Sequence, residues 1–385
     1  MNRIAMALVF LGGVAACGPA KKKDPAPAGP TTANAAAYTR LTIAGDPSPS
    51  GFFDPYLAFD GTTGWLAYSG VAYHNSAGNL VQDVQTNVAK STDAGATWTF
   101  AQPVATPENG FRVTAPDTSL CGAAQCFGHL ISEVPFLLHD ATDPDPAKRW
   151  KMFAHRYFLY PAGQASGKSL QYLLGAIFLQ TAASPDGVWT AGTPVLGWNA
   201  TPPELTAPQN VQTMTPTANC IAMSEGAGLA LPGELDVAFT CIYLSGSNYV
   251  QKIVLFRSTD HAATFTAVGD LLGTTDAASI GGVMPTAPGL AMRGTTPMLL
   301  VTPISASGPY AGCATVDIAD LATAAIDRVG GEPNWRVIYP TQGGAFGGAC
   351  TYSDGATATQ TLTIQLDVAG SPADPFRVYA THAAP

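Results

Sequence analysis

Three acidic residues, far apart in the sequence, each stand directly before a short apolar strand. They are Asp54, Glu133 and Glu225, and a proline or glycine follows each within two residues. Carboxyl groups held in different protonation states can serve as general acid and general base in one reaction. If the three strands enter one site side by side, these side chains predict acid–base chemistry there.

The strands that follow these acids belong to a unit that recurs along the chain, made of an apolar strand, a turn and a second apolar strand. The units start at residues 55, 135, 228, 289 and 349. The chain has 40 Gly, 31 Pro and only 12% charged residues, which favours short strands joined by tight turns. We expect an all-β fold, a five-bladed β-propeller, with six blades as the alternative. Residues 38–43 have strand character and would complete the last blade beside residues 376–379.

Three further segments resemble the Asp box of sialidases and related propellers, Ser-x-Asp-x-Gly-x-x-Trp. In such a turn the Asp accepts backbone N–H bonds, the Gly supplies a positive φ, and the aromatic residue fills the gap between sheets. The resemblance places these turns on the blade periphery, so we expect them to be structural. They comprise Ser91, Asp93, Gly95 and Trp98; a shortened version with Ser184, Asp186, Gly187 and Trp189; and a third with Ser258, Asp260 and Phe265.

The Asp-Pro sequence at the first acid is similar to that of the five-bladed glycoside hydrolases of the arabinanase and xylosidase type. That resemblance implies that Asp54 is the general base, Glu133 the residue that tunes or orients, and Glu225 the general acid. The chain departs from the pattern at the second position, where the family has Asp. The implied function is binding and hydrolysis of glycans.

Two other functions fit the same fold. One is a non-catalytic binding or scaffold propeller of the cell envelope. The other is a sialidase, which requires three arginines and an early Arg-Ile-Pro element. Only Phe111-Arg112-Val113 is similar to that element, and it follows the first Asp-box segment, whereas the family places its arginine before it.

The first residues predict export. Residues 1–16 form a signal peptide with a short apolar run, and Val14-Ala15-Ala16-Cys17 resembles the lipobox of bacterial lipoproteins. The resemblance implies lipid on Cys17 and a cell-envelope location, in the outer membrane of a Gram-negative bacterium because Gly18 follows. Residues 17–37 lack apolar periodicity and predict a disordered tether, which leaves one propeller domain at 38–385.

The composition limits the partners and cofactors. A net charge of -9 argues against nucleic acid, which leaves a carbohydrate ligand and the anchoring membrane; nothing in the sequence defines an oligomeric state. No CxxC motif and no ligand-spaced pair of histidines occurs, so no metal or cofactor is expected. Without Cys17, six cysteines allow 15 pairings, of which sequence proximity favours Cys121 with Cys126, Cys220 with Cys241, and Cys313 with Cys350.

Overall fold

The computed structural model describes residues 29–33, 38–61, 63–76, 79–114, 121–160, 173–308, 310–341, 347–353, 362–367 and 376–381. Nearly all regular structure in these ranges is β-strand, interrupted by short 3-10 turns. The predicted signal peptide and Cys17 lie outside the described residues. Within the described part, no helix is long and apolar enough to cross a membrane.

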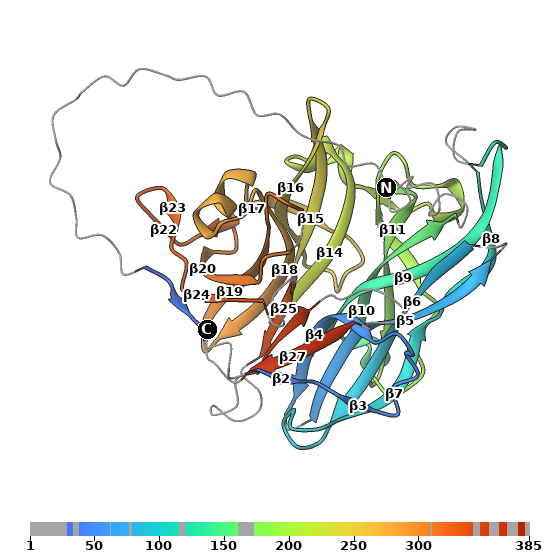
Figure 1. Ribbon diagram of the computed structural model, residues 1–385, viewed down its shortest axis with the longest axis horizontal. Coiled ribbons are helices and arrows are strands. Elements are labelled where there is room, and N and C mark those ends of the chain that lie inside the picture. Colours follow the sequence, from blue (N-terminus) through green and yellow to red (C-terminus); the bar gives the residue numbers. More distant parts are fainter. Residues whose placement is uncertain are drawn as a thin grey trace, which may run out of the picture.

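The described residues form five sheets of four or more strands, which follow one another along the chain (Figure 1). The first contains β3 (Ile43–Ala44), β4 (Phe52–Asp60), β5 (Thr63–Ser76), β6 (Asn79–Ser91) and β7 (Trp98–Ala105). The second contains β8 (Glu108–Thr114), β9 (Gln125–His139), β10 (Trp150–Leu159), β11 (Gly175–Ala182), β12 (Thr193–Gly197) and β13 (Gln209–Asn210). The third contains β14 (Cys220–Leu231), β15 (Glu234–Ser245), β16 (Asn248–Ser258) and β17 (Thr266–Leu272).

The fourth sheet contains β18 (Met284–Arg293), β19 (Thr296–Ile304), β20 (Cys313–Asp320), β21 (Ala325–Ile326), β24 (Val337–Tyr339) and β1 (Thr31–Thr32). The fifth contains β25 (Gly347–Ser353), β26 (Leu362–Asp367), β27 (Arg377–Thr381) and β2 (Thr39–Arg40), and a separate pair is formed by β22 (Arg328–Val329) and β23 (Glu332–Pro333). We call β4, β9, β14, β18 and β25 the inner strands.

The inner strands form a closed ring, in which each contacts the inner strand of the sheet before and after it, including β25 with β4. The sheets radiate from this ring (Figure 1), so the predicted all-β propeller is confirmed. The five repeated units correspond to the inner strands and their partners.

Aromatic side chains fill the space between neighbouring sheets. Phe136 on β9 stacks on Phe153 with ring centroids 4.8 Å apart and meets the edge of Phe239, on the third sheet, at 5.7 Å. The third sheet approaches this closely only because Gly226 lacks a side chain, since a Cβ there would lie 2.5 Å from Phe136 and 2.6 Å from Phe239. The close packing of the second and third sheets therefore depends on glycine at position 226.

The start of the chain closes the ring. Thr39 and Arg40 of β2 pair with β27, as predicted, but the prediction for residues 38–43 holds only in part, because Ile43 belongs to β3 and pairs with Trp98 of β7 in the first sheet. The predicted tether is wrong at its end, however, because Thr31 of β1 pairs in parallel with Val337 of β24, and the described fold begins before residue 38. A two-residue strand is held by backbone hydrogen bonds, which do not depend on a pattern of apolar side chains. The sequence therefore contains no pattern that predicts β1.

The turns of two Asp-box-like segments have the expected hydrogen bonds. Asp93 Oδ1 accepts the N–H of Thr97 at 2.9 Å, and Asp260 Oδ1 accepts that of Thr264 at 2.9 Å. Gly95 has φ +89°, whereas the third segment adopts φ +72° at Ala262 in spite of its Cβ. In the shortened segment the bonds of the Asp186 carboxylate are to the side chains of Ser184 and, at 2.7 Å, Lys90.

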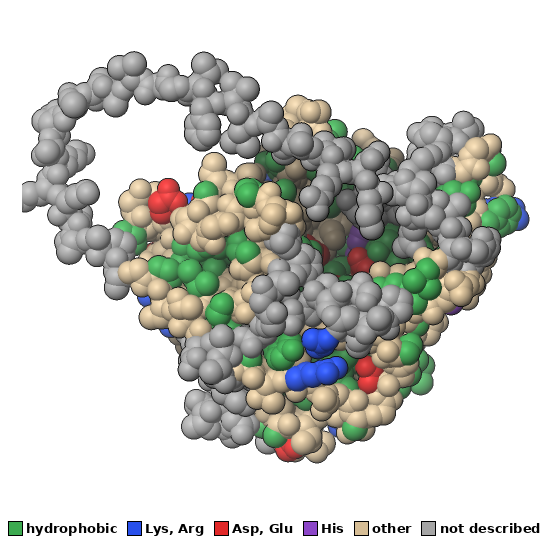
Figure 2. Space-filling model, in the orientation of Figure 1, with side chains coloured by type: hydrophobic (Ala, Val, Ile, Leu, Met, Phe, Trp, Pro, Cys, Tyr) green, Lys and Arg blue, Asp and Glu red, His purple; other side chains and the backbone are tan. Residues whose placement is uncertain are grey.

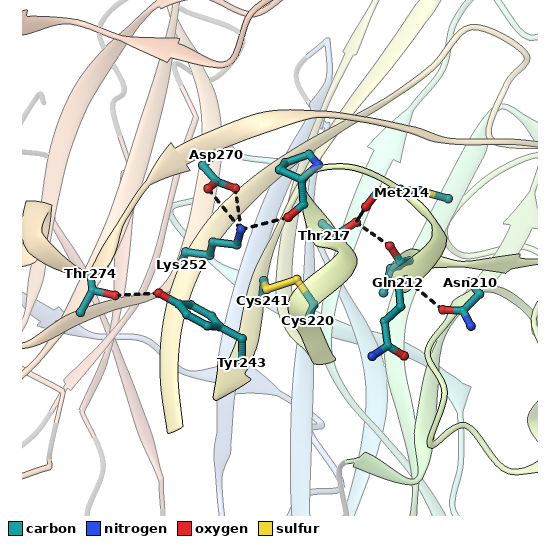
Figure 3. The surroundings of a disulfide bond; sticks show 12 residues. Asn210, Gln212, Met214, Thr217, Cys220, Cys241, Tyr243, Lys252, Asp270 and Thr274 are labelled. Atoms are coloured by element: carbon teal, nitrogen blue, oxygen red, sulfur yellow. Dashed lines mark hydrogen bonds and ion pairs between the residues drawn. A yellow bond between two sulfur atoms is a disulfide. The ribbon is translucent and has the colours of Figure 1, made fainter. Parts of the chain in front are cut away.

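All three predicted disulfides form. Cys121–Cys126 ties the start of β9 to the turn before it, Cys220–Cys241 joins β14 to β15, and Cys313–Cys350 joins the fourth sheet to the fifth. Figure 3 shows the surroundings of Cys220–Cys241, where Lys252 bridges Asp270 and the Pro216 carbonyl.

Candidate carboxylate site at the channel mouth

Each inner strand carries a bulge, at a residue with positive φ. The five residues are Asp54 (φ 48), Val134 (φ 50), Glu225 (φ 40), Ala287 (φ 45) and Ala349 (φ 54), and in every case the strand register shifts at that point. Residues with a Cβ adopt this conformation only at a cost, and bulges of this kind redirect side chains. All five line one cavity on the ring axis. The repeated bulges therefore define one end of the channel.

The channel is narrow at this end. The axial cavity has a volume of about 20 Å³, which is room for one water molecule. Tyr56 lines its floor and bonds through its hydroxyl to the carbonyl and N–H of Gly228. Beyond Tyr56, the opposite half of the channel holds a wider cavity, with a volume of about 310 Å³, between largely apolar strands. Figure 2 shows a hollow in one face of the molecule, with acidic and histidine side chains inside it.

Asp54, Glu133 and Glu225 come together at the narrow end. Burial raises the pKa of Asp54 well above its usual value, and the charges of Glu133 and Glu225 raise it further. Hydrogen bonds from the Ser69 hydroxyl, at 3.5 Å, and from the backbone N–H of Val134 oppose this shift. The charges of Asp54, Glu133 and Glu225 affect one another, so the three carboxyl groups lie in one cluster.

Glu133 precedes the bulge of its strand rather than occupying it, and it pairs across the sheet with His155. Burial raises the pKa of Glu133 to about 7, and the nearby Glu225 also raises it, whereas a hydrogen bond with the Tyr157 side chain lowers it. This carboxyl group therefore changes protonation state near neutral pH.

Glu225 is surrounded by donors. Its Oε2 accepts bonds from the Ala287 N–H at 3.0 Å, from the Thr240 hydroxyl at 3.3 Å and from the Thr286 hydroxyl. Its Oε1 accepts a bond from the hydroxyl of Tyr310. Because an N–H group can only donate, Oε2 acts as an acceptor in this arrangement. Four donors thus hold the carboxylate in one orientation.

A set of hydroxyl residues around the bulges escaped sequence reasoning. Ser69, Thr240 and Thr302 each accept the N–H of the bulge residue in the next sheet, at 2.9, 3.1 and 2.8 Å. They share one register position, opposite the residue before the bulge, and aligning the second strands of the repeated units would have revealed them. Tyr310 lies outside the repeated units, so no pattern pointed to it.

The fold and the site define a β-propeller with an acidic cluster at one mouth of its channel. No protein-family model matches the sequence, and no curated protein does either. Solved structures share the fold at low identity. A family 117 glycoside hydrolase of the marine bacterium Zobellia galactanivorans superposes with a TM-score of 0.50 at 13% identity, over 89% of this chain and 88% of that one.

A thermostable family-43 glycoside hydrolase gives a TM-score of 0.49 at 10% identity, over 88% of this chain and 90% of that one. The catalytic domain of a GH62 α-L-arabinofuranosidase from Coprinopsis cinerea gives 0.47 at 10% identity, over 90% and 96%. At such identities the likeness concerns the fold alone.

Proposed function

We propose that the chain is a five-bladed propeller, with one blade for each sheet of four or more strands, and that it hydrolyses glycans at the carboxylate mouth. A sixth blade would need another sheet of that size, and besides the five the described residues offer only the two-stranded β22–β23 pair. The observation that carries the activity is the cluster of Asp54, Glu133 and Glu225, in which burial raises the pKa of Glu133 to about 7 and that of Asp54 well above its usual value. Hydrolysis of a glycosidic bond requires both a protonated and an ionised carboxyl group.

Asp54 is the general base in this proposal. It lines the axial cavity, whose volume suits one water molecule, the nucleophile of an inverting reaction. A sugar does not fit in that space, so the substrate binds above the mouth. Burial and the charges of Glu133 and Glu225 raise the pKa of Asp54, which makes its ionised form a stronger base.

Glu133 is the proton donor in this proposal, whereas the resemblance to arabinanases implies Glu225. A pKa of about 7 keeps much of Glu133 protonated at neutral pH. Glu225 accepts four hydrogen bonds and, in this proposal, orients the groups around the channel mouth. Under either assignment, substitution of Glu133 or of Glu225 should cause a large loss of activity. The assignments differ in which of the two variants should recover activity on a substrate whose leaving group needs little protonation.

The test is release of reducing sugar from plant and microbial polysaccharides by the wild type and by Asp54→Asn, Glu133→Gln and Glu225→Gln. Each variant should lose at least about 100-fold in kcat, whereas Glu332→Gln, an exposed substitution on β23, should not. On aryl glycosides, whose leaving group needs little protonation, Glu133→Gln should recover activity. Recovery in Glu225→Gln instead would assign the acid to Glu225, and no activity on any substrate would exclude hydrolysis.

A non-catalytic carbohydrate-binding propeller is the second candidate. It is favoured by the bond from Tyr310 to Glu225, which occupies an oxygen that a substrate would otherwise use. Glycan binding without release of sugar, retained in Asp54→Asn, would support it. A sialidase is the least favoured, because the guanidinium of Arg112 lies over the ring of Phe127, 4.7 Å from its centroid.

We also propose that the protein is exported and anchored in the envelope through Cys17. Three disulfides among the other cysteines suit an oxidising compartment. A Cys17→Ser variant should no longer partition into detergent, and mass spectrometry of the wild type should find acyl chains on Cys17. Equal partitioning of both proteins would reject the anchor.

A further inference from the structure

Two histidines and an aspartate lie together on strands of the first two sheets, and none of them belongs to the carboxylate cluster. Their ligand atoms lie within 4.8 Å of one another. His74 Nδ1 is 2.8 Å from Asp83 Oδ2, and His129 Nδ1 is 3.9 Å from Asp83 Oδ1. The residues are 9 and 46 positions apart in sequence, which is why no ligand motif was visible.

Three long strands build this cluster. His74 and Asp83 stand on the β5–β6 hairpin, near its tip, and His129 stands on β9, which packs against both strands. Asn109 on β8 pairs directly with His129, and its Oδ1 lies against His129 Nδ1. The side chains therefore project from regular strands, which hold them more firmly than loops would.

The cluster leaves a polar atom unsatisfied. Asp83 Oδ1 is buried, and no described residue forms a hydrogen bond with it. A buried carboxylate oxygen without a donor is costly, and such atoms call for a partner such as an ion or water. No lysine or arginine among the described residues forms an ion pair with Asp83.

A second cluster, Asp140, Asp143 and His261, makes a useful contrast. There the ammonium group of Lys151 lies 2.6 Å from Asp143 and 3.6 Å from Asp140, and both aspartates are buried. A cation is thus already supplied by the protein. Among the residues that the structure describes, no lysine forms an ion pair with the cluster of His74, Asp83 and His129.

We propose that His74, Asp83 and His129 bind a divalent transition-metal ion of the zinc type. Two imidazoles and one carboxylate suit such an ion, whereas calcium and magnesium prefer oxygen ligands alone. Ligands about 2 Å from the ion lie at most about 4 Å apart, so the cluster needs to contract by about 1 Å. His74 is 36% exposed, which gives the ion a route from solvent.

Calorimetric titration with ZnCl₂ tests this site, using the whole chain with Cys17→Ser in every protein, no histidine tag, and prior treatment with EDTA. The Cys17→Ser background removes the free thiol as a competing ligand. One zinc per chain should bind, and His74→Ala and Asp83→Asn should each weaken binding at least 10-fold. His261→Asn, in the lysine-containing cluster, should leave the affinity unchanged.

Absence of zinc binding in the parent protein, or equal affinity in all variants, would overturn the proposal. If Asp83→Asn does not fold by circular dichroism, His74→Ala decides the outcome, because its side chain is partly exposed. The readout is independent of glycan hydrolysis, so an inactive enzyme that binds zinc leaves this inference intact.

Discussion

Glu133 combines a partly buried side chain with a raised pKa. Burial disfavours the ionised carboxylate, and Glu225 adds like charge, so the pKa rises to about 7 in the folded state. In the unfolded chain the same group has an ordinary pKa near 4.5. Between these two values the native state binds the proton that the unfolded state has released.

This difference predicts how stability depends on pH. The contribution of Glu133 to the free energy of unfolding is fully present below pH 4.5 and is lost as the pH rises through about 7. Glu133→Gln removes the titration. The melting temperature of the variant minus that of the wild type should therefore increase from pH 4.5 to pH 7.5 and then become constant.

Thermal melts in a series of buffers measure this difference, and Glu332→Gln, an exposed carboxyl on β23, is the control that should follow the wild type. A difference that does not vary with pH would mean that Glu133 has an ordinary pKa. That result would also remove the basis for Glu133 as proton donor.

At the scale of elements, the bulges and the hydroxyl residues between sheets act together. A strand with positive φ at a residue other than glycine is strained, and its N–H turns away from its own sheet. The hydroxyls of Ser69, Thr240 and Thr302 accept these N–H groups from the neighbouring sheet. Each bond holds a bulge and joins two sheets.

Thr302→Val tests this arrangement. Valine has nearly the shape of threonine, but it leaves the part-buried N–H of Ala349 without its acceptor, beside the buried side chain of residue 302. The free energy of unfolding should fall by about 1–3 kcal/mol, measured by urea denaturation. Thr302→Ser keeps the hydroxyl and should cost about 1 kcal/mol or less, for the lost methyl group. Equal effects of the two variants would show that the hydroxyl does not matter.

The sequence predicted the inner strands and their acids because apolar strands leave a repeated pattern and Asp54, Glu133 and Glu225 precede them. It did not predict Tyr310 or the positions of Thr240 and Thr302, because hydroxyl residues are common in strands and their partners lie in another sheet. The cluster at His74 and Asp83 depends on the packing of three strands, and pairing across sheets has no local signal.

At the scale of the whole molecule, one disulfide differs from the others. Cys313–Cys350 joins two sheets and spans 37 residues, whereas Cys121–Cys126 spans 5. The entropy of closing these loops in the unfolded chain corresponds to about 4 and about 2 kcal/mol. Replacing both cysteines of the longer bridge by alanine should therefore lower the free energy of unfolding more than the same change in the shorter one. The reverse order in urea denaturation would contradict this account.

Pairing neighbouring cysteines in the sequence predicted all three disulfides correctly, because each bridge joins two cysteines that are consecutive along the chain. The end of the tether was misplaced because the pairing of Thr31 with Val337 joins positions at opposite ends of the chain, and a two-residue strand carries no apolar pattern. Sequence reading therefore succeeded where the contacts are local or repeated, and failed where a short segment gains its structure from a distant partner.

The closure of the ring by the start of the chain gives the last prediction. Deleting residues 1–28 keeps every described strand, whereas deleting residues 1–45 also removes β1, β2 and β3. Without β2, the edge of β27 is exposed, and an open edge favours aggregation. Both deletions remove Cys17, so the comparison isolates the strands. The longer deletion should melt more than about 5 °C below the shorter and should form oligomers on size-exclusion chromatography. Equal melting temperatures would mean that the remaining strands hold the ring closed without these three.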